Sequence, residues 1–198
     1  YMNTSFINRK DRIVASAVEI ISEAGLESLT TKTLAMKENM SESLLYRYFG
    51  GIDEVLVEVV DTFTKFDNSM IATIQAKDIS HFSKVSEFLN TLGTYYGGYK
   101  DMAAIVLNYE GFLHNVNTRD AIAACIYNRT SFVRKELKAA MEEGEIKDIF
   151  TPEELSNILL GAVSRDLLNR RIETDRQKHD VVASTIISKL ESLLLTEQ

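Results

Sequence analysis

Proline occurs once in the 198 residues of this chain, at Pro152. Chains rich in strands usually need more turn-forming residues than this. Residues that favour helices, such as leucine, alanine, glutamate and lysine, are abundant. Hydrophobic residues make up 45% and charged residues 26% of the chain, which is typical of a globular protein and not of a disordered one. We therefore predict an all-α fold.

Hydrophobic periodicity and helix-ending residues predict about nine helices. The first five are expected at 8–24, 31–38, 41–48, 52–76 and 80–98, and the other four at 100–115, 117–144, 152–172 and 177–195. The start near residue 152 is well marked, because Thr151 is a cap, Pro152 takes the first helical position and Glu154 the third.

Residues 31–49, TKTLAMKENMSESLLYRYF, predict two short helices joined by a tight turn. Ser41 can cap the second of them, and Asn39 suits the turn because asparagine tolerates positive φ. Leu45 and Phe49 are four residues apart and are expected to face inward. Such a helix-turn-helix can place its second helix in a DNA major groove.

The first three expected helices resemble the N-terminal DNA-binding domain of the TetR family of transcriptional regulators. The resemblance is carried by Ala17, Ala24-Gly25, LTTKTLA at 29–35, Ser41, LYRYF at 45–49 and IDEVL at 52–56. It is close over the first quarter of the chain and extends to the rest only in helix count, order and length. It implies a helix-turn-helix DNA-binding domain at 1–50 and a helical ligand-binding and dimerisation domain at 51–198.

The resemblance implies double-stranded operator DNA as a partner. Positions matching Thr31, Tyr46 and Tyr48 commonly meet the DNA backbone in this family, and those matching Lys32, Ser43 and Leu44 face base edges; Arg47 adds a cation. A tyrosine hydroxyl can donate to a phosphate oxygen, which positions a protein without reading sequence.

Three features of the chain depart from the family. Glu38-Asn39 stands where Ala-Gly is common, Glu42 where lysine is common, and Ile52 where a lysine contacts a phosphate. Residues 1–50 carry equal numbers of basic and acidic groups, within a net charge of −7. A carboxylate is repelled by phosphates, although glutamate can accept a hydrogen bond from cytosine N4.

The same resemblance implies a small-molecule effector, mostly apolar or aromatic, bound by the later helices. Such pockets are mostly apolar with a few placed polar groups. The candidates are Phe63, Phe66, Phe88, Tyr95, Tyr96, Met102, Tyr109, Glu110, Phe112 and Tyr127. A buried Glu110 would favour a cationic ligand; the alternative places it on a solvated face.

The last two expected helices are candidates for a homodimer interface with two-fold symmetry. Their apolar stripes contain Leu155, Leu159, Val163, Leu167, Val182, Ile186 and Leu190. The alternative is that both are ordinary core helices of a monomer.

Other classes of site find little support. The single cysteine, Cys125, reads as a small core residue, and the three histidines lack metal-ligand spacing. We expect no catalytic arrangement, no cofactor and no membrane segment. We expect a cytoplasmic location. The resemblance to the TetR family thus implies a ligand-released repressor. The alternative is a TetR-like protein that has lost DNA binding and acts as a protein-partner adaptor or coactivator.

Overall fold

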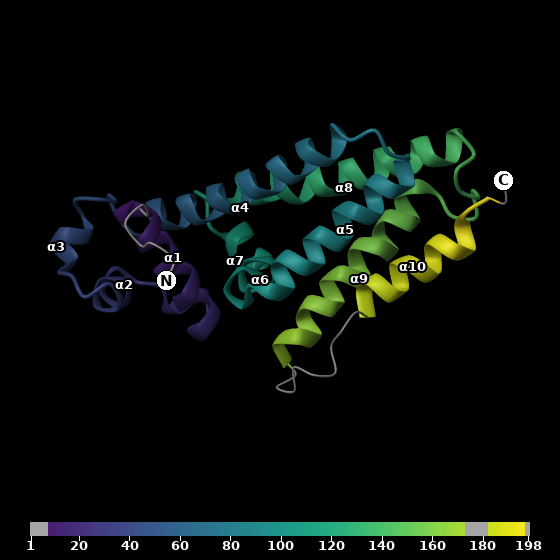
Figure 1. Ribbon diagram of the computed structural model, residues 1–198. Coiled ribbons are helices and arrows are strands. Elements are labelled where there is room, and N and C mark those ends of the chain that lie inside the picture. The colour runs from purple at the N-terminus through teal and green to yellow at the C-terminus, as the bar shows by residue number, and fades with distance from the viewer. Residues whose placement is uncertain (1–7, 173–181, 197–198) are drawn as a thin grey trace. The chain divides into compact units, whose positions relative to one another are not determined.

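The structure is a computed structural model that describes residues 8–172 and 182–196 (Figure 1). In these two ranges it contains α-helices, one 3-10 turn (η2, Leu26–Ser28) and an isolated bridge between Ile146 and Leu195, but no strand. The predicted all-α fold is confirmed. The helices are α1 (Arg9–Ala24), α2 (Thr31–Lys37), α3 (Glu42–Leu45), α4 (Ile52–Gln75), α5 (His81–Gly98), α6 (Lys100–Leu107), α7 (Tyr109–His114), α8 (Arg119–Glu142), α9 (Pro152–Ile172) and α10 (Val182–Leu194).

Two predicted helix boundaries were wrong. The single helix expected at 100–115 is interrupted at Asn108, whose side-chain amide donates to the Ala104 carbonyl at 2.7 Å. Asparagine competes with the backbone in this way and so disfavours helix interiors. The helix expected at 41–48 ends at Leu45, and turn residues follow it. The expected start of the last helix, at 177–181, lies outside the described residues.

The contacts of the chain divide it into two compact units. Unit 1 comprises residues 1–65 and 100–123, and unit 2 comprises residues 66–99 and 124–198. Two of the three boundaries fall inside α4 and α8, so each of these helices contributes residues to both units, and the third falls between α5 and α6. The boundary expected at residue 50 separates a DNA-binding domain from a ligand-binding domain by function. The division into compact units does not test it, so it stays a prediction.

In unit 1 the first helix is held by its apolar stripe. Ile13, Ala17 and Ile21 are at most 1% exposed, and α1 packs against α6 and α2. Gly25 closes α1 with φ 85°, a conformation that glycine adopts without steric cost, and its N–H donates to the Ile21 carbonyl. These contacts fix the base on which α2 and α3 rest.

In unit 2, α5, α9 and α10 pack side by side (Figure 1). The predicted cap of α9 is present: Glu154 accepts from the Thr151 N–H at 2.8 Å, and Thr151 accepts from the Glu154 N–H. The hydrogen bonds that the Thr151 N–H and hydroxyl donate to the carboxylate lower the pKa of Glu154. The Glu145 carboxylate caps α5 by accepting from the backbone of His81 and Phe82. Across both described ranges, every helix is too short or too polar to cross a bilayer.

Candidate functional site

The turn between α2 and α3 forms as its residues predict. Thr30 caps α2 in a reciprocal box with Thr33, and Ser41 caps α3 by accepting from the Leu44 N–H at 3.2 Å. Asn39 has φ 51°, the only positive value among the described residues other than glycine. Leu45 and Phe49 are each 2% exposed, as expected for inward-facing residues. The α2–α3 pair is therefore a helix-turn-helix seated on its own apolar contacts.

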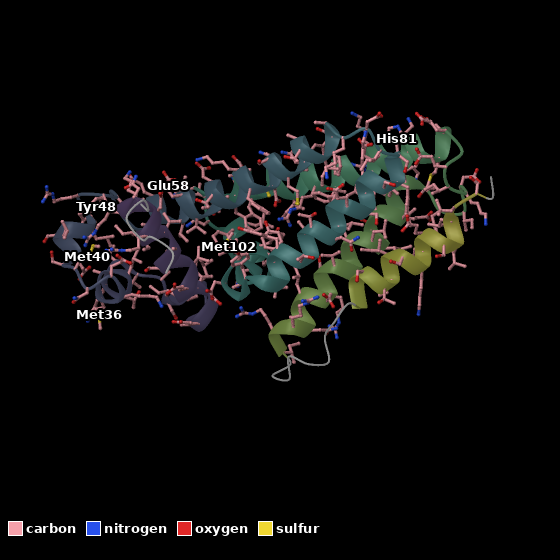
Figure 2. The ribbon with its side chains drawn as sticks, in the orientation of Figure 1. Met36, Met40, Tyr48, Glu58, His81 and Met102 are labelled. Atoms are coloured by element: carbon pink, nitrogen blue, oxygen red, sulfur yellow. The ribbon has the colours of Figure 1, made fainter. Side chains whose placement is uncertain are left out.

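The side chains expected to meet DNA lie on the accessible side of this motif. Lys32, Ser43, Tyr46 and Arg47 are exposed, whereas Thr31, Leu44 and Tyr48 are partly covered. Tyr46 is 53% exposed, and Tyr48 lies in the turn that follows α3 (Figure 2). Neither Lys32 nor Arg47 forms an ion pair with another described residue, so both charges are available to a ligand. Their role in DNA binding stays a prediction.

Glu38 does not point toward a ligand, contrary to the concern that the sequence raised. Its side chain is 5% exposed. The carboxylate accepts from Arg12 Nε at 2.9 Å and from Ser16 Oγ at 2.6 Å, both on α1. A carboxylate with these two donors is neutralised and satisfied within the protein. Glu38 therefore joins the end of α2 to α1 and is a structural residue.

Lys37 is also engaged within unit 1. Its ammonium group lies 2.9 Å from Glu19 and 3.2 Å from Glu23, both on α1. The hydrogen bond to Glu19 is the main cause of a raised pKa of Lys37, and Glu23 adds to it. Lys37 thus serves the packing of α2 on α1 and is not an outward cation.

Glu42 behaves differently from Glu38. It is exposed at the first position of α3, where the helix dipole favours an acidic group. Its Oε2 accepts from the Thr31 hydroxyl at 2.7 Å, which links the N-terminal ends of α2 and α3. No cation in the part of the chain that the structure describes pairs with this carboxylate. Glu42 is therefore an exposed acidic group at the N-terminal end of α3.

The start of α4 is acidic. Glu54 accepts from the Gly50 N–H at 2.7 Å and so caps the helix itself. Asp53 accepts from the Asn115 amide at 3.2 Å. With Glu58 (Figure 2), Val57 and Asn117 these residues line an open hollow of about 260 Å³. Ile52, at the head of the helix, supplies no charge there.

The predicted ligand residues fall in both units. In unit 1, Phe63 and Phe112 are fully buried, Tyr109 meets Phe63 edge-on at 6.0 Å, and Met102 is partly covered (Figure 2). In unit 2, Phe88 and Tyr96 are fully buried, and Phe66 stacks on Tyr95 with 3.7 Å between ring centroids. Tyr127 is 65% exposed and points to solvent.

Glu110 lies on the surface, and its partner is His114, whose Nε2 is 3.0 Å away. The solvated alternative therefore describes this residue, and the argument for a cationic ligand from a buried Glu110 is removed. The exposed Tyr127 and Glu110 therefore do not line an enclosed ligand pocket, contrary to the expectation from the sequence.

A buried polar cluster in unit 2 was missed by the sequence reasoning. Asp67, 1% exposed, accepts from Tyr96 Oη at 2.8 Å and from the Cys125 thiol at 3.2 Å, and it forms an ion pair with Arg129. Arg129 Nη2 also donates to Tyr96 Oη at 3.0 Å. Burial is the main cause of a raised pKa of the adjacent Tyr95, to which Asp67 contributes. Helical spacing placed Cys125 in the core but gave no sign of its partners.

The predicted dimer residues divide into two groups. Leu155, Leu159, Val163 and Leu167 are at most 1% exposed within a single chain, so these side chains are already covered. Ile186 is 36% exposed and Leu190 is partly exposed; the side chain of Val182 lies outside the described residues. Apolar groups that do reach the surface of α9 and α10 are Ile158, Ile172, Ile186 and Leu193. The interface itself stays a prediction.

No group of three or more histidine, cysteine, aspartate or glutamate side chains in residues 8–172 and 182–196 is arranged to hold a metal ion. His81 (Figure 2) lies with its Nδ1 2.6 Å from Glu136. That hydrogen bond is the main cause of a raised pKa of His81.

Comparison with solved structures shows a shared fold over nearly the whole chain. KstR2, a ketosteroid transcriptional regulator of Mycobacterium tuberculosis, is 12% identical, with a TM-score of 0.80 over 96% of each chain. AibR in complex with isovaleryl coenzyme A and operator DNA is 16% identical, with a TM-score of 0.76 over 95% of this chain and 98% of that one. FadR from Bacillus subtilis in complex with stearoyl-CoA is 18% identical, with a TM-score of 0.70 over 93% and 97%.

Comparison with curated protein sequences gives no match. Residues 13–59 match the family model described as bacterial regulatory proteins, tetR family. The matched segment begins within α1 and ends within α4. This range contains the whole α2–turn–α3 motif with its caps and its inward-facing Leu45 and Phe49. The N-terminal segment of the chain is therefore similar to the tetR family model, and the chain as a whole shares the fold of the regulators named above.

Proposed function

We propose that this chain is a DNA-binding transcriptional regulator, a repressor that a small-molecule ligand releases from its operator. The observation that carries the proposal is the α2–turn–α3 motif. Its second helix is exposed, Lys32 and Arg47 have no ion-pair partner among the described residues, and Glu38 is neutralised from within. The AibR structure, which holds operator DNA, supports the same use of the fold.

The direct test is fluorescence anisotropy of the full-length chain with labelled DNA from upstream of its own gene, over a series of salt concentrations. Specific binding that weakens with salt is expected, because released counterions drive such association. Arg47→Ala should reduce the slope of log affinity against log salt by about 1 if Arg47 meets a phosphate. Lys135→Ala, an exposed lysine on α8 in unit 2, is the matched control and should leave the slope unchanged.

The outcome that would overturn the regulator proposal is an absence of specific binding at low salt. In that case the adaptor alternative gains weight, because Glu42 and Ile52 still replace basic residues. The Glu42→Lys/Ile52→Lys variant separates the two readings. An adaptor that has lost DNA binding should gain DNA affinity with these lysines, while the wild type shows none.

For the effector we propose an apolar or aromatic molecule, with acyl-CoA thioesters as the first class to test. AibR and FadR are solved with isovaleryl coenzyme A and stearoyl-CoA, and both share the fold. The stacked Phe66 and Tyr95 beside the Asp67–Arg129 cluster support a site of mixed aromatic and polar character in unit 2. Addition of short- and long-chain acyl-CoA should lower DNA affinity and raise Tm, because a ligand stabilises the state it binds. Unchanged DNA affinity and Tm with every chain length would refute this class.

We also propose a homodimer through α9 and α10. The support is the exposed Ile158, Ile172, Ile186 and Leu193, together with an open hollow of about 540 Å³ along Ser184, Ser188 and Ser192 on α10. Light scattering coupled to size exclusion should give twice the mass of one chain. Leu193→Asp should shift the mass toward one chain, and Leu195→Asp, also exposed but beyond α10, serves as a comparison. A single-chain mass for the wild type at micromolar concentration would refute the dimer.

A further inference from the structure

Glu42 places a carboxylate at the N-terminal end of α3, and this carboxylate needs a hydrogen-bond donor when DNA approaches. Glu42 is exposed, and one of its oxygens, Oε2, is held by the Thr31 hydroxyl at 2.7 Å. The other oxygen, Oε1, accepts from no residue in the two described ranges. Glu38, four residues earlier, has both oxygens occupied by Arg12 and Ser16. Of these two carboxylates, Glu42 alone keeps an oxygen that has no donor among the described residues.

The place of Glu42 in the motif decides what it would meet, and this step rests on the proposed function. The N-terminal residues of the second helix of a helix-turn-helix contact base edges in the major groove. Glu42 is the first residue of α3, and Ser43 beside it is exposed as well. A carboxylate brought there loses water and feels the repulsion of the phosphates, so binding requires a donor on the DNA.

The major groove offers only two hydrogen-bond donors, cytosine N4–H₂ and adenine N6–H₂. An ionised carboxylate can only accept. Beside the adenine amine lies N7, an acceptor, which would face the carboxylate unfavourably. Cytosine presents its amine without that neighbouring acceptor on the same base. We infer that Glu42 selects a cytosine in each half-site of the operator, with Thr31 as a positioning residue that fixes the carboxylate.

The hydrogen bond to Glu42 gives Thr31 a different role. Its hydroxyl has one proton, and that proton is donated to Glu42. The same proton cannot serve a phosphate oxygen, which is the role that the family resemblance implies for this position. In this chain Thr31 therefore acts through Glu42, and its loss should affect the choice of base more than overall affinity.

The experiment is selection of binding sites from a random double-stranded DNA library by the full-length chain and by Glu42→Gln. The wild type should enrich a C·G pair at one position of each half-site. Glutamine pairs with adenine through N6 and N7, so E42Q should enrich A·T at that position and leave the other positions as they were. The preference for the cytosine over the other bases should be about tenfold or more in the wild type.

Three further variants make the result specific. Thr31→Val removes the hydroxyl at nearly constant shape and should lower the cytosine preference several-fold, whereas Thr31→Ser should retain it. Glu27→Gln removes a carboxylate from another exposed position in unit 1 and should change nothing. A thermal melt of each variant verifies that the fold is kept.

The outcomes separate this inference from the function on which it rests. If the wild type and E42Q enrich the same base at every position, the inference is wrong and the regulator proposal stands. If the wild type enriches no site at all, the regulator proposal is wrong, and the proposal that Glu42 selects a cytosine is wrong with it. A cytosine preference that T31V leaves intact would overturn the positioning role of Thr31.

Discussion

Substitution of Arg129 by methionine is expected to destabilise the chain more than any surface change on the same helix. Asp67 is 1% exposed and Arg129 6% exposed, so neither charge has access to solvent. Methionine removes the cation and leaves the carboxylate with only the Tyr96 hydroxyl and the Cys125 thiol as donors. Removing one partner of a buried ion pair costs about 3–5 kcal/mol, because the other charge stays buried.

That cost converts into a large thermal shift. For a chain of this size, each kcal/mol moves Tm by about 2–4 °C, so Arg129→Met should lower Tm by about 6–20 °C. The double variant Asp67→Leu/Arg129→Met buries no unpaired charge, and the Tyr96 hydroxyl and the Cys125 thiol each lose their hydrogen bond to Asp67, at a cost of about 1–3 kcal/mol. It should therefore be more stable than either single variant.

The assay is thermal and urea unfolding followed by circular dichroism, with the four proteins of the double-mutant cycle measured side by side. Arg134→Met is the matched control, because Arg134 lies on the same helix and pairs with Glu153 at the surface. That pair should contribute about 0.2–1 kcal/mol. If Arg129→Met costs no more than Arg134→Met, the view of Asp67–Arg129 as a desolvated, mutually dependent pair is refuted.

Three further predictions concern the helix-turn-helix and the N-terminal end of α5. Glu38→Ala should cost about 1–3 kcal/mol, since Ser16, 8% exposed, and Arg12 lose their acceptor; an unchanged Tm would contradict the structural role of Glu38. Asn39→Val should cost about 1–2 kcal/mol, because φ 51° strains a β-branched residue, whereas Asn39→Gly should be tolerated; equal Tm values for the two would show that the turn has another shape. The third concerns pH: the Glu136 carboxylate raises the pKa of His81 in the folded chain. Its stabilisation is therefore fully present below about pH 6.5 and is lost as pH rises through the folded pKa. His81→Asn should remove this fall in Tm with rising pH, and parallel pH profiles of the two proteins would contradict it.

Local features of the fold were predictable from the sequence because they depend on neighbouring residues. Thr151, Pro152 and Glu154 form the expected helix start, and Asn39 takes the expected turn. Each follows from the chemistry of a few adjacent side chains. The break at Asn108 was missed because a single asparagine, without glycine or proline beside it, is a weak signal.

The candidate site was less predictable because partnerships between distant residues decide it. Asp67 and Arg129 are 62 residues apart, and neither position stands out from its own surroundings. An apolar stripe also looks the same whether it faces the core or a partner chain. Leu155 and Leu159, expected at an interface, are fully covered within one chain for this reason.

The net charge of residues 1–50 is another property that depends on partnerships between distant residues. The sequence predicts a DNA-binding motif there, although the segment has no excess of basic groups. Residues 1–50 have equal numbers of acidic and basic groups, which taken as a sum argues against binding a polyanion. The structure removes several of these charges from the sum, because Lys37 pairs with Glu19 and Glu23, and Glu38 with Arg12. Of the remaining charges, Arg9, Lys10, Asp11 and Glu27 lie outside the α2–α3 motif. The motif itself presents the cations of Lys32 and Arg47, the tyrosines, and one carboxylate held by Thr31. A net charge counts residues, whereas recognition depends on which of them already have partners within the chain.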